Sequence, residues 1–132
     1  MKKGDTMPFT QISLRRGKPA AYRKALMRGV YEAMRETFAV PEEDRFMTVG
    51  EYDEGGFDYG PNYLGIRHSD NLVIVQITAN DTRTIEQKKA LYAAIAAKLA
   101  QDPGLDPADL VINLVEVKKE NWSFGNGVAQ YA

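Results

Sequence analysis

Residues 72–100 read LVIVQITANDTRTIEQKKALYAAIAAKLA, and this stretch decides the fold. It opens with Leu72 to Thr78, an apolar segment of strand length that is rich in β-branched residues. Thr84 then stands three residues before Gln87, the spacing of a capping box at the start of a helix. Apolar residues recur every four positions from about residue 85 to 100, at Leu91, Ile95 and Leu99. The stretch therefore predicts a strand followed directly by a helix.

The same pattern occurs earlier in the chain at a fixed offset. Arg23-Lys24-Ala25-Leu26 recurs as Lys88-Lys89-Ala90-Leu91, an offset of 65 residues (88 − 23). Asp44 falls on Asp109 at the same offset. Each half predicts strand, helix, strand: Phe9–Leu14, about Pro19–Phe38 and about Arg45–Tyr52 in the first, and Leu72–Thr78, about Ile85–Ala100 and Val111–Val117 in the second.

Two strand-helix-strand units predict an α+β fold. Each unit places its two strands parallel with a right-handed crossover, so we expect one four-stranded mixed sheet with both helices on one face. The other face needs a cover, and a domain of this size obtains one by oligomerising. We expect a single domain over residues 7–132, with half-repeats at about 8–52 and 72–117, a linking loop at 53–71 and a tail at 118–132.

Composition narrows the class of protein. A net charge of −1 with 27% charged residues gives no basic field, and no RNA-binding sheet motif is present, so nucleic acid is not an expected partner. The sequence has no cysteine, which rules out disulfides, thiolate catalysis and cysteine-ligated metals. No apolar run approaches the roughly 18 residues that span a bilayer, and no signal-peptide core follows Lys2-Lys3. We therefore expect a cytoplasmic protein that does not associate with membranes.

Met7-Pro8 stands directly before the first predicted strand. The codons for Lys2-Lys3-Gly4-Asp5 can contain AAAGGAG, a bacterial ribosome-binding sequence, so we hypothesise that translation starts at Met7 and that residues 1–6 are an extension. Removal of Met7 would leave Pro8 as the mature terminus. Its nitrogen would then be a secondary amine that carries protons, whereas inside a chain it is an inert amide.

Arg83 is the candidate partner of Pro8. If the halves are related by a pseudo-twofold axis, the start of the first strand neighbours the end of the Leu72 to Thr78 strand, and Pro8 approaches Arg83 just outside the second helix. A guanidinium beside a helix amino terminus suits a carboxylate. An α-amino group has a pKa of about 7.7 to 8.0, and a nearby arginine lowers it, so Pro8 could act as a general base near neutral pH. Keto-enol tautomerisation by such a base needs neither a metal nor a cofactor.

These motifs resemble the tautomerase superfamily and, within it, the group around malonate semialdehyde decarboxylase. The resemblance rests on Met7-Pro8, on residues 40–46 (VPEEDRF), on residues 82–88 (TRTIEQK) and above all on residues 121–127 (NWSFGNG). It implies a homotrimer, a catalytic amino-terminal Pro8 and a substrate carboxylate held by Arg83. It also implies that Asp44 assists the proline or a water, and that Trp122 and Phe124 help to form an apolar pocket wall.

Several alternatives stay open. The decarboxylase has a second arginine where this chain has Asp81, so tautomerisation of a small 2-oxo acid is the leading hypothesis. A decarboxylase or hydratase is the alternative, and a non-catalytic binding module is a third if Pro8 is not the terminus. Asp44 could instead serve a turn, as its counterpart Asp109 would. We expect His68 at the surface and regard Tyr59 and Tyr63 as possible pocket residues, while Trp122 and Phe124 could also pack in an interface.

Overall fold

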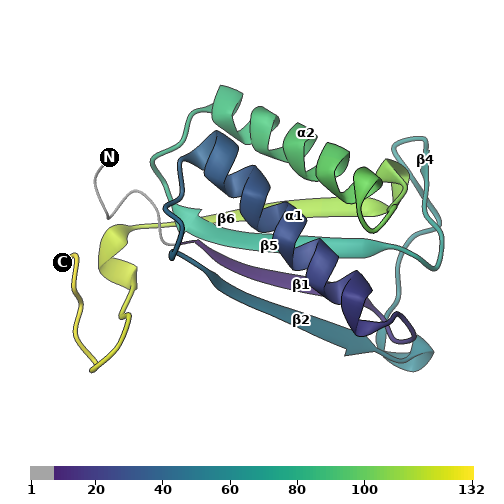
Figure 1. The fold of residues 1–132 in the computed structure, drawn as a ribbon, viewed down its shortest axis with the longest axis horizontal. Helices are drawn as coiled ribbons and strands as arrows, with labels where there is room; N and C mark the ends of the chain where they lie inside the picture. Colours follow the sequence, from purple (N-terminus) through teal and green to yellow (C-terminus); the bar gives the residue numbers. More distant parts are fainter. Residues whose placement is uncertain (1–7) are drawn as a thin grey trace.

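The computed structural model describes residues 8–132. A four-stranded sheet in the order β2-β1-β5-β6 carries both long helices on one face (Figure 1). The sheet consists of β1 (Phe9–Arg15), β2 (Phe46–Tyr52), β5 (Val73–Asn80) and β6 (Leu110–Val117), and the helices are α1 (Ala20–Phe38) and α2 (Ile85–Gln101). The predicted fold class and the six predicted elements are confirmed, with bounds that differ by one or two residues.

The pairing of the strands reproduces the repeat seen in the sequence. β1 runs parallel to β2 and antiparallel to β5, and β5 runs parallel to β6. Gln11 lies opposite Gln76, its counterpart at the 65-residue offset, at the centre of the antiparallel pair. Phe9 pairs with Phe46, and at the same offset Ile74 pairs with Val111. The two βαβ units are therefore related by a pseudo-twofold axis between Gln11 and Gln76.

The core lies between the sheet and the helices. Alternate residues of β1 point into it (Thr10, Ile12, Leu14), and so does the apolar stripe of each helix (Leu26, Val30, Met34 and Phe38 of α1; Leu91, Ile95 and Leu99 of α2). Full burial of a side chain of this kind contributes about 1.5 to 3 kcal/mol. The amphipathic spacing read from the sequence thus fixes which face of each helix meets the sheet.

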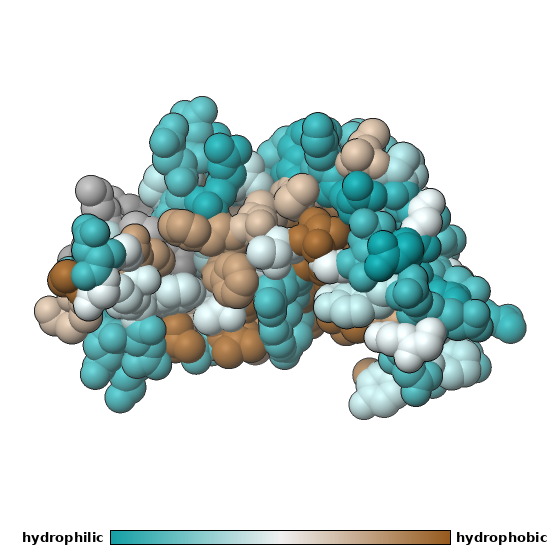
Figure 2. Space-filling model, turned by 90° about the horizontal axis from the view of Figure 1, so that it is seen from below, coloured by the Kyte–Doolittle hydropathy of each residue, from teal (hydrophilic) through white to brown (hydrophobic). Residues whose placement is uncertain are grey.

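The opposite face of the sheet has no helix over it. Its side chains in the described strands are uncharged between the two ends, namely Phe46, Thr48 and Gly50 of β2, Phe9, Gln11 and Ser13 of β1, Ile74, Gln76 and Thr78 of β5, and Val111, Asn113 and Val115 of β6. From the β2 side, apolar residues gather along the middle of the molecule and hydrophilic ones crowd one end (Figure 2).

The linking segment and the tail also take definite shapes. Residues 53–71 contain a short 3₁₀ turn and a small hairpin made of β3 (Asn62–Tyr63) and β4 (Ile66–Arg67). The tail turns back beside the sheet end where β1 begins and β5 ends (Figure 1). Among residues 8–132, no helix is both long and apolar enough to cross a membrane.

Candidate active site

The candidate site lies where β1 begins. Phe9 pairs with Phe46 on one side and with Thr78 on the other, so Pro8 lies beside the start of β2 and the end of β5. Pro8 is buried. The predicted extension, residues 1–6, and the predicted initiator Met7 lie outside the described residues. The structure therefore places Pro8 at the start of β1.

Arg83 comes to the same end of the sheet, three residues after the last residue of β5. The predicted capping box is present, because the Thr84 hydroxyl accepts a hydrogen bond from the Gln87 backbone N–H at 3.2 Å and the Gln87 side chain accepts one from the Thr84 N–H at 3.0 Å. Arg83 donates from Nη2 to the Phe38 carbonyl at 3.1 Å, and its guanidinium carbon lies 4.6 Å from the Phe38 ring centroid. These contacts hold the guanidinium between the end of α1 and the start of α2.

Asp44 is the buried carboxylate of this end. It is 7% exposed and lies two residues before Phe46, the partner of Phe9. Its counterpart Asp109 is 5% exposed at the other end of the sheet, where its carboxylate accepts hydrogen bonds from the Ser69 backbone N–H at 2.6 Å and from the Ser69 hydroxyl at 2.5 Å. The Asp109 carboxylate therefore joins the linking segment to the start of β6.

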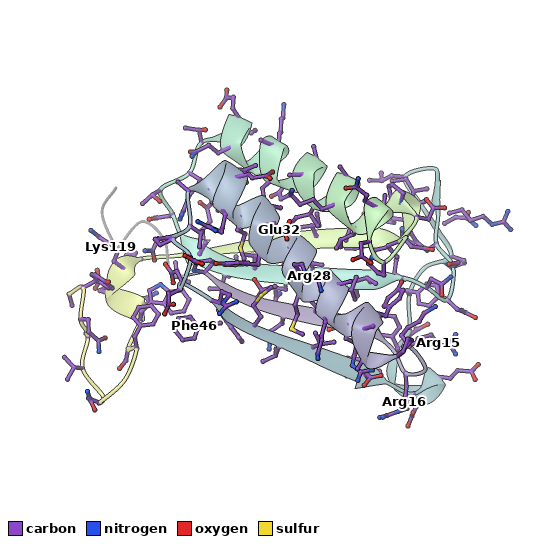
Figure 3. The ribbon with its side chains drawn as sticks, in the orientation of Figure 1. Arg15, Arg16, Arg28, Glu32, Phe46 and Lys119 are labelled. Atoms are coloured by element: carbon purple, nitrogen blue, oxygen red, sulfur yellow. The ribbon has the colours of Figure 1, made fainter. Side chains whose placement is uncertain are left out.

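Aromatic residues of the tail form a wall beside Pro8. Trp122 donates from Nε1 to the Asn80 side-chain oxygen at 2.8 Å and stacks on Phe124, with ring centroids 5.2 Å apart and planes 16° apart. Phe124 in turn contacts Phe46 at 5.8 Å and Tyr131 at 6.1 Å. Figure 3 shows Phe46 next to the tail and Arg15 at the opposite end of the sheet. Because Asn80 belongs to β5 and Phe46 to β2, this aromatic wall spans the start of β1.

Three residues of this site were missed from the sequence: Phe46 and Tyr131, which contact Phe124, and Asn80, which binds Trp122. Asn80 carried a usable signal, since a polar residue that closes an apolar strand needs a hydrogen-bond partner when it is buried. A second contact shapes the tail, where the Gln130 side chain accepts from the Phe124 N–H and donates to the Gly125 carbonyl, both at 3.0 Å. The tail turns at residues 125–127, where Asn126 and Gly127 lie in the left-handed region at φ 61° and 67°.

The remaining candidates lie at the far end of β1. Seven strand residues separate Pro8 from this end, a distance of about 20 Å. Tyr59 donates a hydrogen bond to Asp70, and Arg15 pairs with the same carboxylate at 2.8 Å; this hydrogen bond and the guanidinium hold the pKa of Asp70 below its usual value. Tyr63 is 68% exposed in the hairpin. Within one chain, Tyr59 and Tyr63 therefore lie far from Pro8.

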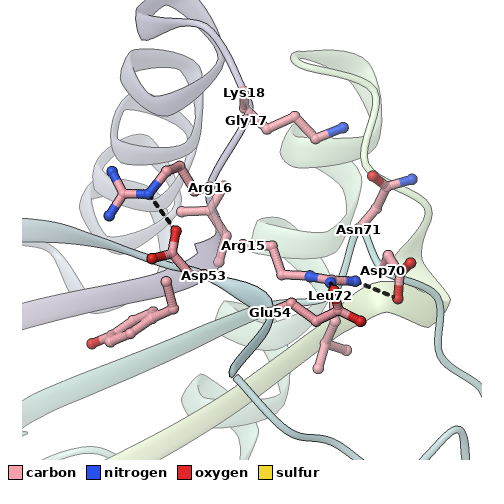
Figure 4. Close-up of a pocket in the computed structure, with 11 residues that line it drawn as sticks. Arg15, Arg16, Gly17, Lys18, Asp53, Glu54, Asp70, Asn71 and Leu72 are labelled. Atoms are coloured by element: carbon pink, nitrogen blue, oxygen red, sulfur yellow. Dashed lines mark hydrogen bonds and ion pairs between the residues drawn. The ribbon is translucent and has the colours of Figure 1, made fainter. Parts of the chain in front are cut away.

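His68 also belongs to this far end. It is half-buried, and its Nδ1 lies 2.9 Å from the Gly60 carbonyl. This contact joins two parts of the linking segment. A pocket of about 550 Å³ opens nearby (Figure 4). Its charged lining residues are largely paired with each other, as in the 2.8 Å contacts Arg15–Asp70 and Arg16–Asp53. The pocket therefore offers little net charge to an acidic substrate.

Comparison with known proteins adds an independent line of evidence. The sequence model of a family described as "Tautomerase enzyme" matches residues 44–125. The probable tautomerase YusQ of Bacillus subtilis strain 168 is 40% identical over 124 residues, which cover 94% of this chain and 98% of YusQ.

Solved structures agree with this match. Malonate semialdehyde decarboxylase, whose structures were described as a basis for decarboxylase and hydratase activities, is 31% identical with a TM-score of 0.85 over 92% of this chain and 93% of its own. A symmetric trimer of wild-type fused 4-OT, 20% identical, has a TM-score of 0.74 over 91% of this chain and 94% of its own, a likeness that concerns the fold alone.

Proposed function

Because the chain belongs to the tautomerase enzyme family, we propose that it is a cofactor-independent tautomerase that interconverts the enol and keto forms of a small 2-oxo acid, with Pro8 as its amino-terminal base. The observation that supports this most directly concerns the end of the sheet where β1 begins. A buried proline, an arginine held between two helix ends and an aromatic wall all lie at this end. The resemblance stated from the sequence therefore agrees with the family match.

The proposed reaction moves protons and nothing else. The neutral Pro8 amine takes the proton of the enol hydroxyl and returns a proton to C3, so the carbonyl forms without any change of oxidation state. Arg83 binds the substrate carboxylate, which its guanidinium can do with two parallel N–H donors. Asp44, two residues before the partner of Phe9, assists Pro8 or a water. Trp122 and Phe124 cover the planar body of the substrate.

A decarboxylase or hydratase is the second candidate. It is favoured by the 31% identity to malonate semialdehyde decarboxylase, which extends over nearly the whole chain. There Pro8 would polarise a 3-oxo group as a cation or form an iminium, and Asp44 would orient water. The resemblance implies a second arginine of that enzyme at the position of Asp81, and the lack of this donor here makes the decarboxylase the second candidate rather than the first.

We also propose that three copies of the chain, each one domain over residues 7–132, assemble through the sheet face that has no helix over it. The uncharged side chains of that face and the trimer formed by fused 4-OT, which shares the fold, support this assembly. Sedimentation or light scattering of the purified protein measures the number of copies.

A cytoplasmic location fits the absence of cysteine from the sequence.

The test uses protein shown by mass spectrometry to begin at Pro8. Ketonisation of an enolpyruvate, followed by loss of its ultraviolet absorbance, should be fast with this protein and should fall to the buffer rate with Pro8→Ala. The matched control retains residues 1–7, which converts the Pro8 nitrogen into an amide, and should also be inactive. A Pro8-starting protein that ketonises no faster than buffer would refute the tautomerase. Carbon dioxide release from malonate semialdehyde by that same protein would support the second candidate.

A further inference from the structure

Asn80, the last residue of β5, is a buried polar residue that the proposed chemistry does not use. It is 2% exposed, and a buried amide destabilises the fold unless it forms hydrogen bonds. Its hydrogen bond comes from the indole of Trp122, 42 residues further along the chain. The bond therefore joins the tail to the strand that pairs with β1.

The chemistry of the indole fixes the orientation of the Asn80 amide. Oxygen and nitrogen of an amide are often interchangeable in a structure, but the indole Nε1–H is a donor and never an acceptor. The Asn80 oxygen must therefore face Trp122, and its NH₂ group must face away. One acceptor thus sets the position of Nε1, while stacking on Phe124 sets the plane of the indole.

We propose that Asn80 is a positioning residue that holds Trp122 in place as part of the aromatic wall beside Pro8. Asn80 lies on one side of the start of β1, and Phe46, which Phe124 contacts, lies on the other. Among the described interactions of the indole, loss of the hydrogen bond leaves the stacking on Phe124, so the ring can turn out of the wall. The substrate role of this wall rests on the proposed function, whereas the anchoring of Trp122 does not.

Trp122 is the only tryptophan in the chain, so its fluorescence reports on the anchor directly. Asn80→Leu keeps the side-chain shape and removes the acceptor, whereas Asn80→Asp keeps an acceptor. Asn80→Leu should shift the emission to the red and increase quenching by acrylamide, and Asn80→Asp should stay close to wild type. Ser69→Ala is the control, because it removes a side-chain hydrogen bond to buried Asp109, at 2.5 Å, at the end of the sheet that is remote from the tail. It should leave the emission unchanged.

The kinetic test compares Asn80→Leu in two backgrounds. In the wild-type background it should raise KM for the enolpyruvate about 10-fold, with a smaller effect on kcat, because a displaced wall weakens substrate positioning. In the Trp122→Phe background it should have no further effect on KM, because the indole N–H is already absent.

Three results would overturn the proposal. Wild-type emission and quenching in folded Asn80→Leu would show that Asn80 does not hold the indole, and an equal rise of KM in both backgrounds would show that it acts independently of Trp122. Failure of Asn80→Leu to fold while Asn80→Asp folds with displaced emission would also count against it. The emission and quenching measurements need no activity, so they stay decisive even if the wild-type protein proves not to be a tautomerase.

Discussion

Asp109 and Asp44, which are related by the 65-residue offset, should have different functions. Truncation of Asp109 should lower the stability of the fold, whereas truncation of Asp44 should lower the activity. Asp109 accepts two hydrogen bonds from Ser69 at the end of the sheet that is remote from Pro8. A hydrogen bond to a charged group contributes about 1.5 to 3 kcal/mol. Because the pair is partly buried, we take the lower value for each bond, so Asp109→Ala should lower the free energy of unfolding by about 3 kcal/mol. Ser69→Ala removes only the hydroxyl bond and should lower it by about 1.5 kcal/mol.

Urea unfolding followed by far-UV circular dichroism measures both changes, at one fixed protein concentration because an oligomer gains stability with concentration. The folded Asp109→Ala protein should keep the wild-type kcat/KM for ketonisation, since its carboxylate lies about 20 Å of strand away from Pro8. Asp44→Ala, in contrast, should lower kcat/KM by about 10²-fold, the lower range for loss of an acid-base group.

Two outcomes would refute this reasoning. An Asp109→Ala protein within about 0.5 kcal/mol of wild type would mean that the Ser69 contacts do not stabilise the fold, since that is the range of ordinary surface substitutions. Equal losses of kcat/KM in Asp109→Ala and Asp44→Ala would mean that the two ends of the sheet do not differ in function.

Three further predictions concern packing, capping and pH. A Cβ added at Gly29 would lie 2.6 Å from Cδ2 of buried Leu99, so Gly29→Ala should lower the free energy of unfolding by about 1 to 3 kcal/mol, and Leu99→Val in the same protein should recover part of the loss. Thr84→Ala removes the cap of α2 and should cost about 1 kcal/mol, measured by urea unfolding. The hydrogen bond from Tyr59 lowers the pKa of Asp70, so the stability it contributes is present above the pKa of an unfolded aspartate and is lost as pH falls through the lowered folded pKa. Carboxyl NMR titration should therefore find a higher pKa for Asp70 in Tyr59→Phe.

The features that could be predicted from the sequence depend on neighbouring residues. The Thr84-x-x-Gln87 capping box acts within one helical turn, and the i, i+4 stripes select a helix face, so both helices followed from the sequence. The 65-residue offset could be carried into three dimensions because the pairing of β1 with β2 recurs 65 residues later in the pairing of β5 with β6, as Phe9–Phe46 and Ile74–Val111 show. The position of Arg83 outside the second helix followed from the same cap.

The contacts that could not be predicted join distant segments with no periodic signal. The bond between Trp122 and Asn80 spans 42 residues and depends on how the tail turns after β6. Tyr59 and Tyr63 suggested a pocket because they are aromatic residues in a linking segment. The hairpin in that segment instead exposes Tyr63, and Asp70 draws Tyr59 toward Arg15 at the far end of β1.

The pseudo-twofold axis gives both ends of the sheet the same backbone, so the difference between them must come from side chains. At the far end, the counterpart of Pro8 at the 65-residue offset is Val73, and the counterpart of Arg83 is Lys18. Val73 follows Leu72 in the chain, so its nitrogen is a peptide amide that cannot act as a base. Ser69 already occupies Asp109, and the aromatic tail contacts only the end that carries Pro8 among the described residues. A repeated fold can therefore hold one site of the proposed kind, because a chain has a single amino terminus and this tail reaches a single end.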